Sequence, residues 1–347
     1  MISILSGSAT VFRSILNITR CLLRSAQTQL IAREKVPRLS SWNIPLYLLI
    51  LAMRAYISAH SRDLLNLRAI TDSSLIPTIP QGARSMHALI GGVDCEVVRS
   101  KGFRSVESLE VHSWKDHRVI LYLHGGGGAL CSSRTHRVIT HSLSVRCDSI
   151  LVVPNYRRVP EVSLLHTLED SISVYESLLG WVDAKQIAIC GDSAGGALSV
   201  LTLCRIRDRK LPMPSCGVLL SPWCNIREVP AVPSPVDYLT QDVIAFMIEL
   251  LQGEGGLSEH QLQETNPMCV DLTGLPPLCV QLGDAELFAD QIRAFVKRCS
   301  VSDVNVVLHE YHEMVHIPHF FSFLSSEGER AMADAASFVK SNVCPLF

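Results

Sequence analysis

The chain has 347 residues, of which 48% are hydrophobic, 18% charged and 6% aromatic. At about 150 residues per domain, this length suits two domains or one large α/β domain, and the composition excludes a disordered or collagen-like chain. The 31 lysines and arginines are balanced by 33 acidic residues, so the net charge of -2 argues against nucleic acid as a partner. We therefore expect a folded protein that binds a neutral or apolar small molecule.

Residues 1–84 form a separate N-terminal region in this interpretation. Residues 1–33 contain arginines but no acidic residue, which is typical of a transit peptide or of an amphipathic helix. The apolar run from Ile44 to Met53 is too short to cross a bilayer, which takes about 20 residues. We expect helices that contribute to a cap over the rest of the protein, with organelle targeting or peripheral membrane contact as alternatives. Proline and glycine between Pro77 and Gly82 end this region.

Residues 85–347 show the pattern of an α/β domain. Short apolar runs alternate with helical stretches, and their continuous apolarity predicts strands buried on both faces of a mostly parallel sheet. The pattern loosens between about residues 224 and 275, where a helical piece from Gln241 to Gln252 predicts an insertion. The six strand-like runs are Val119–Leu123, Ile150–Val153, Gln186–Cys190, Val218–Leu220, Leu278–Leu282 and Val304–Tyr311.

Twelve cysteines are scattered from Cys21 to Cys344 without a C-x-x-C pair, a spacing that favours neither a disulfide framework nor a zinc site. We predict that most are small buried apolar side chains in a reducing compartment, and hence a cytoplasmic protein. The alternative is an oxidised secreted enzyme. The glycosylation sequon that begins at Asn17 favours this alternative.

A strand-to-helix turn carries the candidate nucleophile. Gly191-Asp192-Ser193-Ala194-Gly195 matches G-x-S-x-G and lies between the run Gln186–Cys190 and a helical stretch that ends near Asp208. Such a turn holds the serine in a strained backbone conformation with its Oγ exposed, and the helix N-terminus favours developing negative charge. The alternative is a glycine-rich turn that binds a phosphate. The absence of a P-loop lysine argues against this alternative.

Four consecutive glycines follow the first strand-like run, in the segment His124-Gly125-Gly126-Gly127-Gly128. They cost backbone entropy when ordered, so they need a purpose such as bringing N–H groups together around an oxygen anion. With the serine motif, this segment resembles the H-G-G-G signature of the hormone-sensitive lipase-like branch of the α/β-hydrolases. The resemblance spans roughly Val119 to Phe320 and includes Thr135-His136-Arg137, Asn155-Tyr156-Arg157, Ser221-Pro222-Trp223 and Leu275-Pro276-Pro277.

This resemblance implies an α/β-hydrolase fold with an eight-stranded sheet and a helical cap. It also implies a carboxylic ester hydrolase that forms an acyl-enzyme with a small-molecule ester, and we expect no cofactor. The oxyanion donors would be N–H groups of Gly126, Gly127 and Ala194, with Gly125 adjacent. Gly128 stands where the family usually has a bulky residue, so we expect a wider wall on the acyl side. The oligomeric state stays open, a homodimer included.

A serine nucleophile needs an acid and a histidine, which follow it in that order in α/β-hydrolases. The segment from Gly283 to Asp290 resembles the family's G-x-x-[DE]-x-L-x-D, which implies Glu286 as the acid, with Asp284 as the alternative. Met314-Val315-His316 resembles the family's M-x-H after the last strand, which implies His316 as the base.

The same histidine completes a zinc motif, H-E-x-x-H, in residues 312–316. Zinc enzymes place this motif on a helix, but here it follows a strand-like run, and Pro318 interrupts any helix, so we predict no metal. His312 and His319 are expected in the loop or at the pocket rim.

The second hypothesis is a catalytically silent receptor of the same fold. The plant gibberellin receptors resemble this family but have lost the catalytic histidine. All three triad positions are filled here, which favours the enzyme. A thioesterase, lactonase or amidase would use the same residues and remains an alternative to an esterase.

Overall fold

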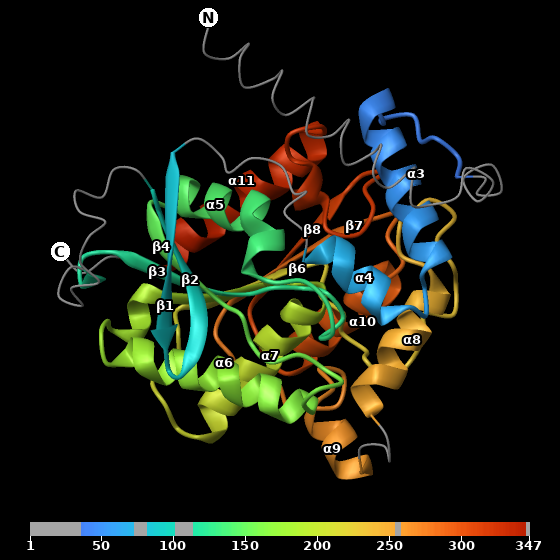
Figure 1. Cartoon of the computed structure of the whole chain (residues 1–347). Coiled ribbons are helices and arrows are strands. Elements are labelled where there is room, and N and C mark those ends of the chain that lie inside the picture. Colours follow the sequence, from blue (N-terminus) through green and yellow to red (C-terminus); the bar gives the residue numbers. More distant parts are fainter. Residues whose placement is uncertain (1–35, 73–81, 101–113, 254–257, 345–347) are drawn as a thin grey trace, which may run out of the picture.

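A central eight-stranded sheet organises the chain (Figure 1), and the computed structural model describes residues 36–72, 82–100, 114–253 and 258–344. The order of the strands is β1-β2-β4-β3-β5-β6-β7-β8. β2 runs antiparallel to β1 and β4, whereas all other neighbours are parallel. The predicted eight-stranded, mostly parallel α/β architecture is therefore confirmed. The basic N-terminal segment, the glycosylation sequon and the predicted break at residues 77–81 lie outside the described residues.

Each of the six predicted runs overlaps a strand between β3 and β8. The first two strands were not predicted, because polar and apolar residues are mixed along β1, which lies at the edge of the sheet and is partly exposed. The strands are β1 (Ala83–Ile90), β2 (Val93–Ser100), β3 (Arg118–Leu123), β4 (Ser149–Pro154), β5 (Ile187–Asp192), β6 (Cys216–Leu220), β7 (Leu278–Gly283) and β8 (Val306–Tyr311).

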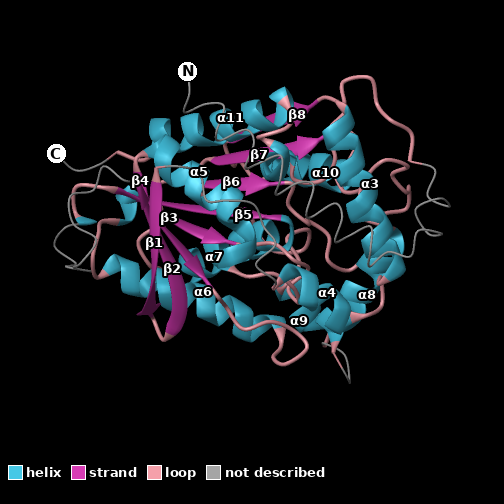
Figure 2. Ribbon diagram, turned by 45° about the horizontal axis from the view of Figure 1, so that its top comes forward, coloured by secondary structure: helices cyan, strands magenta, loops and turns pink. Residues whose placement is uncertain are grey.

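Helices cover both faces of the sheet (Figure 2). On one face lie α5 (Arg137–Cys147) and α11 (Ser326–Asn342), and on the other α6 (Leu164–Leu179), α7 (Ser193–Asp208) and α10 (Ala289–Val301). Successive residues of β3 point to opposite faces, so that Leu121 packs toward α6 and α7 while Ile120 packs toward α5 and α11. This explains the continuous apolarity of the strands, since both faces are buried.

Within the described residues, four more helices lie outside these layers: α3 (Ile44–Ala59), α4 (Leu64–Thr71), α8 (Gln241–Gln252) and α9 (Glu259–Glu264). α3 begins where the Asn43 side chain accepts the Leu46 N–H at 2.9 Å, with a proline in the first turn. α8 has the bounds predicted for the helical piece of the insertion. None of the helices in the described ranges is both long and apolar enough to span a bilayer.

The cysteines of the described residues are free, and most of them are buried. Burial raises the pKa of several of these thiols to about 12, so they stay protonated and pack as small apolar side chains, as predicted.

Candidate active site

Ser193 stands at the sharp turn between β5 and α7, with a φ of +53°. This left-handed conformation is strained for a serine and is the geometry expected for a nucleophile on such a turn. The turn also forces the strand and the helix together. A Cβ at Gly195 would lie 2.0 Å from the Leu123 carbonyl oxygen, and a Cβ at Gly191 would lie 2.4 Å from the Gly195 carbonyl oxygen. Both glycines of the motif are therefore required, because a side chain at either position would clash with the neighbouring backbone.

The glycine loop lies directly beside this turn. Gly126 has a φ of +112°, and a Cβ there would lie 2.3 Å from the Leu130 carbonyl oxygen. The Gly125 N–H donates to Asp192 Oδ1 at 3.0 Å, so it is already committed within the protein. No hydrogen bond among the described residues uses the N–H groups of Gly126 or Gly127. Of the three glycines expected at an oxyanion hole, Gly125 thus anchors the loop. The N–H groups of Gly126 and Gly127 are available to donate hydrogen bonds to an anion.

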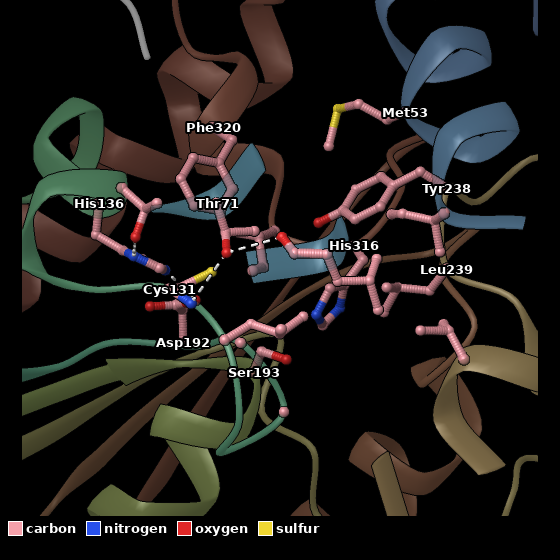
Figure 3. Close-up of a pocket in the computed structure, with 18 of the residues that line it drawn as sticks. Met53, Thr71, Cys131, His136, Asp192, Ser193, Tyr238, Leu239, His316 and Phe320 are labelled. Atoms are coloured by element: carbon pink, nitrogen blue, oxygen red, sulfur yellow. Dashed lines mark hydrogen bonds and ion pairs between the residues drawn. The ribbon is translucent and has the colours of Figure 1, made fainter. Parts of the chain in front are cut away.

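Asp192 forms a buried polar cluster behind the nucleophile. Its carboxylate accepts hydrogen bonds from Tyr122 Oη at 2.7 Å and from the Gly125 N–H. His136 Nε2 donates to it over 3.1 Å, and Figure 3 shows these two side chains together. Burial alone would raise the pKa of Asp192, but His136 and the Tyr122 hydroxyl hold it below its ordinary value. The sequence reasoning assigned no role to Asp192 or His136, although Asp192 stands inside the serine motif.

Glu286 and His316 meet at the same end of the sheet. Glu286 Oε1 lies 3.3 Å from His316 Nδ1, while Oε2 accepts the Ser221 hydroxyl at 2.6 Å and the Gly283 N–H at 2.9 Å. The other ring nitrogen of His316, Nε2, is buried without a hydrogen-bond partner in the described part of the chain. His316 and Ser193 line the same pocket (Figure 3).

The charges around His316 set its protonation. Burial alone would lower the pKa of His316, but the hydrogen bond and the negative charge of Glu286, together with Asp237 and Asp192, raise it above the ordinary histidine value. A carboxylate placed in this way stabilises the imidazolium that forms when a histidine takes a proton.

Asp284, the alternative acid, faces a different histidine. Its Oδ2 lies 3.0 Å from Nδ1 of His312, whose side chain is 76% exposed, and its Oδ1 accepts the Glu313 N–H at 2.6 Å. The structure therefore brings Glu286, and not Asp284, to His316.

The residues of the H-E-x-x-H motif lie in a turn after β8 and not on a helix. Glu313 has a φ of +56°, and its carboxylate accepts the Ser41 N–H at 2.7 Å. Within the described ranges, no group of His, Cys, Asp and Glu side chains is arranged to hold a metal ion. His319, expected in the loop or at the pocket rim, lies in the short 3-10 helix Pro318–Phe321 after β8 and is fully buried, with Nε2 2.6 Å from Gln281 Oε1 and with burial lowering its pKa to about 3.

The pocket above Ser193 has a volume of about 320 Å³ and an apolar lining. The lining comes from the N-terminal helices, from the insertion and from the loop after β8, and includes Leu49, Met53, Ile57, Ile70, Ile244, Met247 and Phe320. In Figure 3, Phe320 lies on the His136 side of this pocket, and Met53, Tyr238 and Leu239 lie on the His316 side. Such a space suits an apolar ligand with its reacting group near Ser193.

A second, much smaller cavity lies on the other side of the serine motif. It has a volume of about 20 Å³, and its lining includes Gly128, Ala194, Trp223 and Leu251. We expected Gly128 to widen this wall. Leu251 of α8 lies against this glycine, since a Cβ on Gly128 would lie 3.2 Å from Leu251 Cδ2. A side chain of α8 therefore borders this cavity beside the glycine loop.

The chain belongs to the alpha/beta hydrolase fold family, whose profile matches residues 120–320. An acetyl-hydrolase of Streptomyces hygroscopicus is 31% identical over 235 residues, which cover 65% of this chain and 77% of that protein. An esterase of Acinetobacter venetianus is 28% identical over 232 residues, covering 65% of this chain and 75% of its own length.

The solved structures point to one branch of this family. The crystal structure of an esterase from the bacterial hormone-sensitive lipase family aligns with a TM-score of 0.70 and 26% identity, over 93% of this chain and 98% of that one. This is the branch that the H-G-G-G and G-x-S-x-G segments predicted.

Proposed function

We propose that this ester hydrolase is a serine esterase, which cleaves carboxylic esters of small to medium apolar substrates through an acyl-enzyme on Ser193. The observation that carries the proposal is the contact between Glu286 and His316 at the base of an apolar pocket that Ser193 also lines. A binding protein has no need of an imidazole whose Nδ1 faces a buried carboxylate while Nε2 is left without a partner.

In this mechanism, Ser193 Oγ attacks the ester carbonyl while His316 Nε2 takes the hydroxyl proton. The oxyanion is stabilised by the N–H groups of Gly126, Gly127 and Ala194, each typically worth about 2.7–4 kcal/mol. His316 then gives its proton to the departing alcohol. Water attacks the acyl-enzyme with His316 again as the base, and Ser193 is regenerated as the acid is released.

The two cavities suggest how an ester is oriented. The cavity beside Ala194 has room for little more than one water-sized group, so it suits a short acyl chain such as acetyl. The larger apolar pocket then receives the alcohol part. The relative named acetyl-hydrolase supports this orientation.

Hydrolysis of p-nitrophenyl esters with acyl chains of increasing length tests the proposal. We expect turnover by the purified protein that is highest for the shortest acyl chains and is lost in Ser193→Ala. If no ester is turned over in a manner that depends on Ser193, the proposal fails and the receptor hypothesis gains.

A further inference from the structure

Asp237 is a fully buried carboxylate that the triad does not include. It lies between β6 and α8, within the insertion, where no sequence motif marks it. Its Oδ2 accepts the Leu287 N–H at 2.7 Å, and its Oδ1 accepts the His316 N–H at 3.3 Å. Leu287 directly follows the acid Glu286. One side chain therefore binds the backbone of both loops that carry the acid and the base.

The segment around Asp237 is itself held in place. The Ser234 hydroxyl accepts the Asp237 N–H at 3.0 Å and donates to the Ala285 carbonyl oxygen at 2.7 Å, which gives the acid loop a second tie. Arg54 of α3 donates to the carbonyl oxygens of Ser234 and Asp237. Helix α3, the insertion and both triad loops thus share one network of hydrogen bonds.

We propose that Asp237 is a positioning residue of the triad, whose carboxylate ties the acid loop and the base loop to the cap and so sets the contact between Glu286 and His316. This inference rests on the proposed esterase function. An asparagine at position 237 cannot do the same, because its NH₂ group would face one of the two backbone N–H donors.

The charge of Asp237 adds a second effect. The titratable or charged groups around it are His316, Glu286, Tyr238 and Arg54. Burial raises the pKa of Asp237 to about 6, although the charge of His316 and the Leu287 N–H act to lower it. Where His316 is neutral and active, Asp237 is therefore ionised, and its charge is one of those that raise the pKa of His316. Removing that charge lowers the pKa of His316.

The test compares Asp237→Asn with Glu96→Gln. Glu96 is another fully buried carboxylate, and it accepts the Arg137 Nε–H at 2.8 Å. It lies on β2, far along the sheet from the triad loops that follow β7 and β8. Both variants lose a buried charge, so both are expected to melt at lower temperature. Only Asp237→Asn should change the reaction.

For Asp237→Asn we expect kcat per folded molecule to fall roughly 10- to 100-fold, as for a small misplacement of catalytic groups, with KM little changed. The acid limb of kcat/KM should move to lower pH, as expected on removal of a nearby opposite charge. A folded Asp237→Asn protein with the kcat and midpoint of the wild type would overturn the inference, as would a change no larger than that in Glu96→Gln.

If Asp237→Asn does not fold, a second variant still tests the inference. Ser234→Ala removes the hydroxyl that holds both Asp237 and Ala285, and it should lower kcat several-fold, whereas an unchanged kcat would contradict the inference. The result is also separable from the proposed function, because a wild-type protein without esterase turnover refutes the function before any variant is compared.

Discussion

Replacing the Glu286 carboxylate by an amide tests the geometry of the triad. In Glu286→Gln, the side-chain oxygen is held where it accepts the Ser221 hydroxyl and the Gly283 N–H, so the NH₂ group points at His316 Nδ1. A donor there forces the proton of the neutral ring onto Nε2, which can then no longer take the proton of Ser193. We expect kcat to fall by about 10⁴, as for the wrong tautomer in a serine protease. That loss corresponds to about 5 kcal/mol of transition-state stabilisation.

The assay is the kcat for a short p-nitrophenyl ester, measured on variants with the melting temperature of the wild type. Asp284→Asn is the matched control, since Asp284 is a neighbouring carboxylate that contacts the exposed His312. We expect it to cost far less than Glu286→Gln. A larger loss in Asp284→Asn than in Glu286→Gln would refute the reasoning and move the acid by two residues.

Three further predictions concern pH, metal and acyl length. The kcat/KM should rise with pH through one ionisation with a midpoint above the ordinary histidine value of about 6.5, because the raised pKa of His316 keeps the ring protonated and inactive below it; a midpoint below that value would contradict this. Prolonged chelation should leave activity unchanged, and loss with recovery on adding zinc would reverse our interpretation of residues 312–316. Leu251→Ala should enlarge the small cavity and raise butyrate over acetate hydrolysis roughly tenfold, about the effect of one methylene in a pocket; an unchanged ratio would place the acyl chain elsewhere.

The features that sequence could predict are local. The serine turn depends on five consecutive residues whose strand, turn and helix follow one another, and the buried strands from β3 to β8 show in their continuous apolarity. β1 and β2 escaped this criterion because they form the antiparallel end of the sheet and mix polar with apolar residues. Antiparallel strands do not need the continuous apolar pattern of a central parallel strand.

The features that sequence could not predict depend on contacts between distant segments. Asp237 lies 79 residues before His316 and 50 before Leu287, and a single aspartate in a loosely patterned insertion gives no sign of these partners. Likewise, the glycine at position 128 suggested a wider wall, and the sequence did not indicate that Leu251 of α8 lies against it. Both depend on where the insertion packs, and periodicity does not carry that information.

Covalent labelling with a small alkyl phosphonate tests the central claim most directly. The phosphonate reacts with a serine that a neighbouring base activates, and peptide mass spectrometry identifies the modified residue. We expect a single adduct, on Ser193, whose formation parallels the loss of esterase activity and which is absent from Ser193→Ala. An adduct on another serine that accompanies inactivation, or full inactivation with Ser193 unmodified, would contradict the account.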